Sequence, residues 1–582
     1  MVQPQGGIKM RRFPIKRSGF RRSLRTIVAL IAAGVTILAL TPVGGRASST
    51  TFSADYVSTS LAGGEPFVIY SRSAGDLVYS GHEGTTHIYN GGGPPQPGDT
   101  CDIHNAQGFV CSYTNQVNNW YSTDGGLTWT KSPGNPAYTG FSDPSLTEDA
   151  GSTTVAPVVY NTGINLVNDA LFATQDGGKT WIAGTPQCHQ GDRPWLAGGH
   201  SGEVFMGTDD SLNSHVVVRG TVTFDSVTHT ALTITCTPGF IPDAAAASGS
   251  SIGDQLYYSH KDGALVEPAR FSNGRLGIAV LPNASTADFS STSGATTTPF
   301  VQHPDPNSAG TTFNDLLGPR IIIGPDNTIY MVWATHPTDP HSTNGCNGAN
   351  TPLPNQILMA YTKDEGLTWS ATKTVAQMTN AVAWWPWAAA GAAGNVSVVW
   401  YQSDQPTDTN CDSAASVLHS HSTNWTVQVA NIYGATTTTY PVPALNAVPN
   451  FDGLHAGGIF HVGSICQSGT TCALNTTAGQ QDRRLGDYVT NALDQNGCVM
   501  VATADTQLTD SLPPPAGGGG FRTGRPMFVH QVGGQSLTTG LDCAQFAPTI
   551  PEAPAMTALL GAGALAIGLA VAIGRRRRTA MV

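Results

Sequence analysis

Short apolar runs separated by polar turns are the dominant pattern along this chain of 582 residues. Apolar runs of roughly four to eight residues bounded by Gly, Pro, Asp or Asn are typical of β-strands and short for helices. Pairs of such runs flank a turn in seven places: 66–78, 144–160, 194–207, 256–271, 319–333, 386–400 and 485–502. This recurrence predicts an all-β chain built from one repeated strand–turn–strand unit.

A second repeat has a tighter sequence signature. The pattern Ser/Thr-x-Asp-x-Gly-x-Thr-Trp occurs at Ser122–Trp129, Thr174–Trp181 and Thr362–Trp369, each time after an apolar or aromatic run. The Asp can accept hydrogen bonds from backbone N–H groups inside a turn, the Gly can take a positive φ, and the Trp can cover the hairpin. The repeated residues therefore indicate turn chemistry and not repeated catalysis.

This pattern resembles the Asp-box, or bacterial neuraminidase repeat, of sialidase-like β-propellers. The resemblance implies a peripheral turn between the third and fourth strands of a blade, so Asp124, Asp176 and Asp364 are assigned a structural role. The seven strand–turn–strand units then predict a sialidase-like β-propeller over residues 65–535. Sialidases have six blades, so six and seven both stay open, and the unit count favours seven. An N-terminal strand near Phe67–Tyr70 is expected to complete the last blade.

The N-terminus predicts export. Residues 1–47 hold nine Lys and Arg, no acid, and the apolar run Thr26–Leu40 followed by small residues. That order is typical of a cleaved signal peptide, and an uncleaved anchor is the alternative. Residues 48–64 are then expected to be a linker that leads into the propeller.

The C-terminus predicts a membrane anchor. Residues 556–574 are uncharged and mostly apolar, and four arginines follow at 575–578. A helix of this length spans the bilayer core, and the positive-inside rule assigns residues 575–582 to a cytoplasmic basic tail. Residues 536–555 are expected to be the linker before this transmembrane helix. The propeller is thus predicted to lie outside the cell, held at its surface by one span.

The distribution of charge excludes nucleic acid as a partner. Thirteen of the 28 Lys and Arg lie in the first 47 residues and the 575–578 run, which leaves 15 basic against 39 acidic side chains for the rest of the chain. Such a surface repels phosphate backbones, and an anionic ligand needs a local cluster of arginines. The 40% hydrophobic content is that of a folded body and excludes a polytopic membrane protein.

Ten cysteines lie in the exported part, and their even number suggests disulfides. Pairing of sequence neighbours is the working hypothesis: 101–111, 188–236, 346–411, 466–472 and 498–543. The chain holds no CxxC pair and no HExxH motif, so the sequence predicts neither a zinc site nor a cofactor.

The sialidase resemblance also implies a site at the mouth of the central channel. That family binds the sugar carboxylate with three arginines, since a guanidinium matches a carboxylate in a bidentate way. It uses a Tyr nucleophile with a Glu partner and an Asp as acid/base. Residues at the expected starts of innermost strands fit most of these roles: Arg193, Arg320 and Arg484 (or Arg483) for the clamp, Asp192 or Asp487 for the acid/base and Tyr488 for the nucleophile. The candidate for the Glu partner is Glu267, chosen among the seven glutamates of the exported part because others lie in or near turns.

Two functions of different class follow. The first is a surface-anchored, sialidase-like glycoside hydrolase that removes terminal sialic or related acidic sugars from glycans. The alternative is a non-catalytic propeller that binds glycans or proteins, and a weaker third is action on another polysaccharide with two carboxylates in one cleft. Convergence of three arginines with a Tyr–Glu pair in one pocket would favour the first. A site poor in arginine would favour the second.

Overall fold

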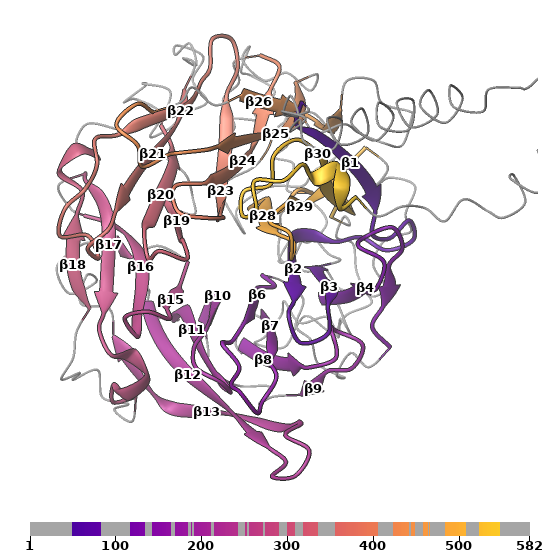
Figure 1. Cartoon of the computed structure of the whole chain (residues 1–582), viewed down its shortest axis with the longest axis vertical. Coiled ribbons are helices and arrows are strands. Elements are labelled where there is room, and N and C mark those ends of the chain that lie inside the picture. Colours follow the sequence, from indigo (N-terminus) through magenta and orange to yellow (C-terminus); the bar gives the residue numbers. More distant parts are fainter. Residues whose placement is uncertain are drawn as a thin grey trace, which may run out of the picture. The chain divides into compact units, whose positions relative to one another are not determined.

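A computed structural model describes the body of the chain from Ser49 onward, with gaps. The described residues are 49–82, 117–133, 143–164, 169–183, 188, 191–210, 215–242, 251–252, 255–271, 274–289, 300–308, 318–335, 355–405, 423–440, 444–447, 458–463, 465, 484–507 and 523–547. They form seven antiparallel sheets arranged around a centre, a seven-bladed β-propeller (Figure 1). The prediction of an all-β propeller is confirmed, and seven is the number of blades.

The first three blades take up the chain from Gly64 to Pro242. Blade 1 contains β2 (Gly64–Ser71), β3 (Asp76–His82), β4 (Val117–Ser122) and β5 (Thr130–Lys131). Blade 2 contains β6 (Leu146–Glu148), β7 (Val159–Ile164), β8 (Asp169–Thr174) and β9 (Ile182–Ala183). Blade 3 contains β10 (Gly191–Gly198), β11 (Glu203–Asp210), β12 (His215–Phe224) and β13 (Ala231–Pro242).

The next three blades follow in order. Blade 4 contains β14 (Ser251–Ile252), β15 (Tyr257–Ser259), β16 (Ala264–Arg270), β17 (Leu276–Leu281) and β18 (Val301–Pro304). Blade 5 contains β19 (Arg320–Ile323), β20 (Ile329–Ala334), β21 (Gln356–Thr362) and β22 (Lys373–Gln377). Blade 6 contains β23 (Ala383–Ala390), β24 (Val396–Ser403), β25 (Asn424–Ile432), β26 (Ala444–Ala447) and β27 (Ile459–Val462).

Blade 7 closes the ring with strands from both ends of the described body. It contains β28 (Thr490–Leu493), β29 (Val499–Asp505) and β30 (Arg525–Gly533), and β1 (Thr51–Tyr56) pairs antiparallel with β30 as the outermost strand. The prediction that Phe67–Tyr70 completes the last blade is wrong, because these residues lie in β2, the inner strand of blade 1. The predicted linker 48–64 is corrected as well, since its residues 51–56 are β1.

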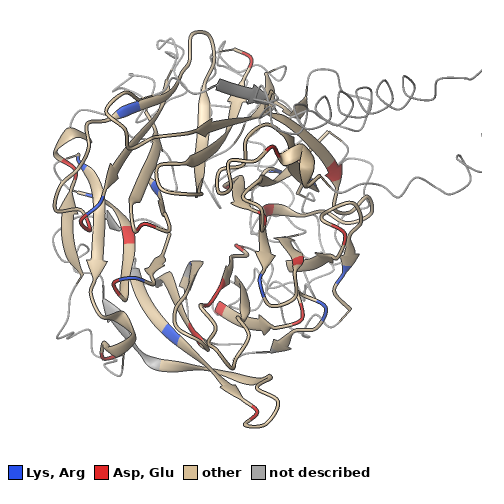
Figure 2. Ribbon diagram, viewed as in Figure 1, with Lys and Arg blue, Asp and Glu red and all other residues tan. Residues whose placement is uncertain are grey.

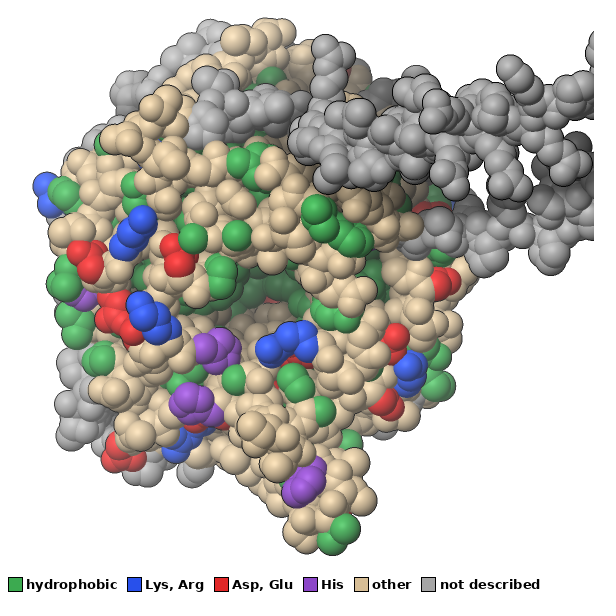
Figure 3. All heavy atoms as spheres, in the orientation of Figure 1, with side chains coloured by type: hydrophobic (Ala, Val, Ile, Leu, Met, Phe, Trp, Pro, Cys, Tyr) green, Lys and Arg blue, Asp and Glu red, His purple; other side chains and the backbone are tan. Residues whose placement is uncertain are grey.

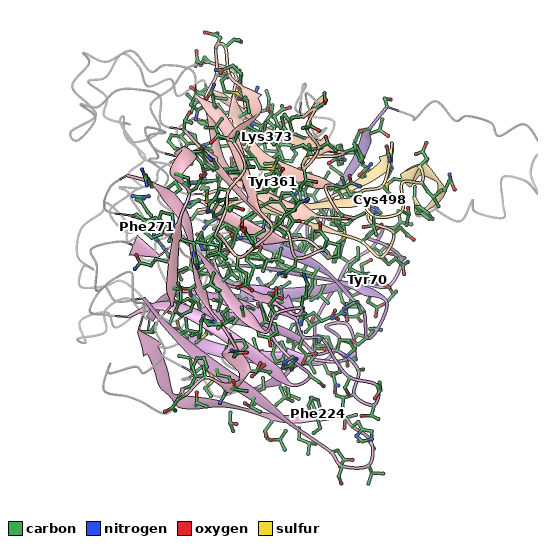
Figure 4. The ribbon with its side chains drawn as sticks, turned by 60° about the vertical axis from the view of Figure 1, so that its left-hand side comes forward. Tyr70, Phe224, Phe271, Tyr361, Lys373 and Cys498 are labelled. Carbon is green, nitrogen blue, oxygen red and sulfur yellow. A yellow bond between two sulfur atoms is a disulfide. The ribbon has the colours of Figure 1, made fainter. Side chains whose placement is uncertain are left out.

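The segment after β30 is also part of the folded body. Leu537 is fully buried, its N–H donates to the Gly497 carbonyl, and its own carbonyl accepts from Ala392 N–H and Asn395 Nδ2. A disulfide joins Cys498 (labelled in Figure 4) to Cys543, and a second joins Cys188 to Cys236. Neighbour pairing of cysteines is confirmed for these two bonds. The predicted linker 536–555 therefore starts too early, because its first residues pack on blades 6 and 7.

Each of the three repeated Asp motifs forms a turn between the third and fourth strands of its blade: β4–β5, β8–β9 and β21–β22. In the second, Asp176 accepts from Thr180 N–H at 2.9 Å and from the Thr174 hydroxyl at 2.8 Å. Partial burial opposes ionisation of Asp176, but these hydrogen bonds lower its pKa on balance. The Asp thus holds the turn closed, as its assigned structural role requires.

Blade sheets bury both faces, which explains the apolar runs of the sequence. The strands Val159–Ile164, Asp169–Thr174 and Ile329–Ala334 are buried along their whole length. No helix in the described part of the chain is long and apolar enough to cross a membrane. The predicted signal peptide 1–47, the transmembrane segment 556–574 and the other three cysteine pairs lie outside the described residues.

Candidate functional site

The inner strands share a distinctive start. In six blades a residue at or just before the start of the inner strand has a positive φ. These residues are Glu65 (46°), Asp143 (49°), Arg193 (56°), Gly318 (74°), Trp385 (54°) and Gly486 (72°). A proline follows in all of these except Gly486. Register shifts accompany this start in β2, β10 and β23. A left-handed residue at a bulge re-aims the next side chains, and here it turns them toward the ring centre.

The side chains two positions further on meet in the middle of the ring. Phe67, Trp195, Trp387 and Tyr488 come from blades 1, 3, 6 and 7, and every pair among them has ring centroids 5.3–5.9 Å apart. Arg320 from blade 5 lies with its guanidinium carbon 5.3 Å from the Trp195 ring centroid and 4.9 Å from that of Trp387. We call these five residues the plug. All are at most 8% exposed, so the plug closes the centre of the propeller.

Burial changes what two predicted site residues can do. Tyr488 is 1% exposed, and its hydroxyl donates to the Pro144 carbonyl at 2.8 Å. Desolvation, followed by the charges of Glu65, Asp143 and Asp487, raises the pKa of Tyr488 well above its usual value. Arg320 is 3% exposed and uses its planar face on two indoles. Both residues therefore lie inside the packed centre of the described body.

Three buried carboxylates form one cluster near the starts of the inner strands of blades 1, 2 and 7. One oxygen from each of Glu65, Asp143 and Asp487 lies within 4.8 Å of the others. The backbone N–H of Asp143 donates to Glu65 Oε2, and His82 Nε2 lies 3.3 Å from the same oxygen. Three carboxylate oxygens at this spacing have the chemistry to hold a hard cation such as Ca²⁺. Sequence reasoning missed Glu65 and Asp143, although Glu65-Pro66 and Asp143-Pro144 share the X-Pro pattern of Arg193-Pro194, which was among the candidates.

The structure brings together only part of the predicted clamp and catalytic set. Arg320, Asp487 and Tyr488 meet at the centre, since both charges act on the Tyr488 hydroxyl. Arg193 begins the inner strand of blade 3, and Arg484 donates to the Thr506 carbonyl at 3.3 Å. Glu267 is fully buried in β16, the second strand of blade 4. The side chain of Asp192 and all of Arg483 lie outside the described residues, and the catalytic roles stay predictions.

A cavity of about 170 Å³ lies along the inner strands beside the plug. Phe67, Trp195 and Trp387 of the plug form its floor, and its walls come from residues 145–148, 196–198 and 255–258 of blades 2, 3 and 4, with His260 at the end of β15. Figure 3 shows a hollow at the centre of one face, lined by hydrophobic side chains, with basic and histidine side chains at its edge. The sequence alone did not identify this cavity, because its lining residues come from five different blades.

The ionisable groups at the cavity are either paired with an opposite charge or favoured in their neutral form. Glu148 is the one carboxylate among the described lining residues, and it pairs with Arg72 across blades 1 and 2. Burial raises the pKa of Glu148 while the hydrogen bonds from Arg72 oppose the shift. Desolvation, with the positive charge of Arg72, lowers the pKa of His260 and favours its neutral form. No Arg or Lys occurs among the described lining residues.

A hydrogen-bonded chain supports one wall of the cavity. The Tyr258 hydroxyl lies 3.0 Å from His200 Nε2 and 2.9 Å from Ser285 Oγ, and Ser285 Oγ donates to Glu203 Oε2 at 2.6 Å. In contrast, the buried indole N–H of Trp195 has no hydrogen-bond partner in the described structure. A buried donor without a partner costs free energy, so an acceptor supplied by a ligand or a water would be favourable there.

Comparison with known proteins assigns the chain to no family. No family model and no curated protein matches the sequence. The chain is similar to a protein of unknown function from Dyadobacter fermentans DSM 18053, with 10% identity, a TM-score of 0.36, and coverage of 84% of this chain and 100% of that one. It is also similar to the Trypanosoma rangeli sialidase (10% identity, TM-score 0.33, 69% and 56% covered). A third similar structure is the GH93 alpha-L-arabinofuranosidase of Fusarium graminearum with arabinobiose (11% identity, TM-score 0.32, 84% and 98% covered).

Proposed function

We propose that this protein is a non-catalytic, surface-exposed β-propeller that binds glycans in the cavity beside its plug. The observation that carries this proposal is the lining of the cavity, which combines aromatic rings with uncharged hydrogen-bonding groups and contains no described arginine. Ligand sites are typically concave and mostly apolar, with a few placed polar groups. Sugars present both apolar C–H faces and hydroxyls, and aromatic side chains with a polar rim match that character.

The geometry gives less support to a sialidase-type hydrolase. A carboxylate clamp requires several arginines in one open pocket, with guanidinium groups that are available for bidentate hydrogen bonds. Here Arg320 is buried against two indoles, and three protein carboxylates share the same centre. A centre with more carboxylates than guanidinium groups disfavours an anionic sugar. Figure 2 shows acidic residues on several elements that border the middle of the ring.

The proposed location is the outer surface of the cell, with residues 556–574 as the anchor and 1–47 as the export signal. Two disulfides in the folded body support an oxidising compartment. Glycans are abundant ligands in that location, whereas the acidic body excludes nucleic acid.

The test is a glycan-array screen of the purified chain together with hydrolysis of a fluorogenic sialoside. We expect binding to neutral glycans, loss of that binding in His260→Ala, and no sialoside turnover. His229→Ala is the matched control, because His229 is exposed on the turn between β12 and β13, away from the cavity lining. Sialoside turnover that is abolished by Arg320→Ala in a folded protein would replace this proposal with the hydrolase. Absence of binding to every glycan would also overturn it.

A further inference from the structure

The cavity is closed on the side of the plug. Its floor residues Phe67, Trp195 and Trp387 are between 4% and 8% exposed, and Tyr488 behind them is 1% exposed. The guanidinium group of Arg320 packs against both indoles. A chain cannot pass through a centre packed in this way, since protein cores leave few voids larger than a water molecule.

The walls leave one direction of approach. The inner strands of blades 2, 3 and 4 run from Ser145, Trp195 and Gln255 at the floor toward Glu148, Gly198 and His260 at the rim. The rim is where exposure begins, because Arg72, which pairs with Glu148, keeps 53% of its side chain exposed. A ligand therefore enters from the rim and stops at the plug.

The volume limits the ligand to one small unit. Sites for drug-sized ligands have volumes of about 300–1,000 Å³, well above the 170 Å³ measured here. That space equals roughly five or six water molecules at about 30 Å³ each, which suits a single sugar ring and not a disaccharide.

The polar groups at the cavity select an uncharged unit. Among the described residues the Trp195 indole N–H has no acceptor. Ser145 and Thr147 line the cavity, and their hydroxyls accept backbone N–H groups from Leu196 and Gly198. Their own hydroxyl hydrogens can therefore point to a ligand oxygen. Glu148 is already paired with Arg72, so neither an anion nor a cation finds an uncompensated opposite charge there.

We infer that the cavity is a blind pocket that takes the uncharged terminal residue of a glycan and rejects internal residues of a chain. This inference rests on the proposed function, because it assumes that the cavity is a glycan site. The ligand chemistry is a neutral pyranose or furanose ring whose remaining glycan leaves through the rim beside Glu148 and His260. End recognition follows from the closed floor, since an internal residue needs an exit for the chain on both sides.

The experiment uses the full chain in a detergent that has no sugar headgroup. Ligand-observed saturation-transfer NMR is run with D-glucose, D-galactose, D-mannose and L-arabinose, with the linear hexamer of each sugar that binds, and with a cyclic oligomer such as α-cyclodextrin for glucose. We expect the Kd of a monosaccharide and the Kd of its linear hexamer, both expressed per molecule, to differ by no more than about threefold. That ratio corresponds to a difference in binding free energy below about 1 kcal/mol. Saturation should fall on the terminal residue, and the cyclic form should not bind.

Two variants separate the possible failures. Ala197→Phe fills the cavity wall and should weaken binding roughly tenfold or more through steric exclusion, whereas Ala371→Phe places the same side chain at an exposed site and should not. Two results would overturn end recognition and leave glycan binding intact. The first is an affinity that rises with the number of internal residues in the glycan. The second is binding of the cyclic form that Ala197→Phe weakens. Absence of binding by every sugar would overturn the proposed function itself.

Discussion

Removal of the Arg320 guanidinium should destabilise the propeller at its centre. Arg320→Met keeps an unbranched side chain of similar length but deletes the charge and the planar group that contacts Trp195 and Trp387. The remaining side chains of the plug stay in place, so the variant isolates the contribution of the cation. Arg320 is 3% exposed, and solvent cannot replace it.

Two effects set the size of the loss. A cation that lies over an aromatic ring contributes about 2 kcal/mol when it is desolvated, and here two indoles share one guanidinium. Removal of one partner from a buried charged cluster costs about 3–5 kcal/mol, because the other charges stay buried. The carboxylates of Glu65, Asp143 and Asp487 are the charges concerned, and the Tyr488 hydroxyl lies in the field of all three as well as of Arg320. The two effects overlap, so we expect a total near 3–5 kcal/mol.

Guanidinium chloride unfolding followed by tryptophan fluorescence measures this loss, since Trp195 and Trp387 report on the plug. The midpoint should fall at an unchanged slope. Arg219→Met is the comparison at a more exposed site: its guanidinium carbon lies 5.0 Å from a single ring, that of Phe289, its Nη1 donates to the Ser285 carbonyl at 2.8 Å, and the side chain is 23% exposed. That variant should lose about 1–2 kcal/mol, less than Arg320→Met.

An Arg320→Met protein within about 0.5 kcal/mol of the parent would refute the reasoning, as would a larger loss in Arg219→Met. Arg320→Lys gives an internal check. Lys restores the charge without the planar group, so it should recover part of the stability if both the charge and the stacking matter.

Three further outcomes follow from the fold and the cavity rim. Asp176→Asn should lower the free energy of chemical unfolding by only about 1 kcal/mol, because the turn is partly exposed to solvent. The stabilisation by the Asp176 carboxylate is present above about pH 4 and is lost as the pH falls through its lowered pKa in the folded state. His260→Gln should flatten the pH dependence of the thermal midpoint below about pH 6.5. Burial, with the positive charges of Arg72 and His200, lowers the pKa of His260 in the folded state, so the unfolded chain binds the proton first and stability falls with the pH until the folded imidazole is protonated as well. Replacement of Cys498 and Cys543 by Ser opens a loop of 45 residues and should cost up to about 4 kcal/mol, measured as a lower midpoint in the absence of reductant; an unchanged midpoint would contradict a structural role for this bond.

Local features of the fold were predictable from the sequence, and the register of distant segments was not. All seven strand–turn–strand units correspond to a hairpin of one blade, the first two strands in six blades and β15–β16 in blade 4, because the apolar runs and turn residues of a hairpin lie close together in the chain. β1 was assigned to a linker, since its partner β30 follows more than 450 residues later and the six residues TFSADY carry a weak strand pattern. Such pairing depends on tertiary context.

The site was only partly predictable for a similar reason. Asp487, Tyr488 and Arg320 were found because they start inner strands, the expected location of propeller sites. Their burial depended on the aromatic side chains contributed by Phe67, Trp195 and Trp387 from three other blades. A single sequence gives the residue types but not the packing among blades, so it could not distinguish an open arginine clamp from a closed centre.

The strand that closes the ring has a consequence for the order in which the protein is made. β1 is the first of the described strands to leave the ribosome, but its hydrogen-bonding partner β30 is the last of them to be synthesised, and the Ser53 hydroxyl donates to the His530 carbonyl across 477 positions. Until then β1 remains an unpaired strand next to six blades that can form from local contacts. Closure of the propeller is therefore a late event of high contact order, and we expect chains interrupted before Arg525 to be open rings, prone to aggregation and proteolysis.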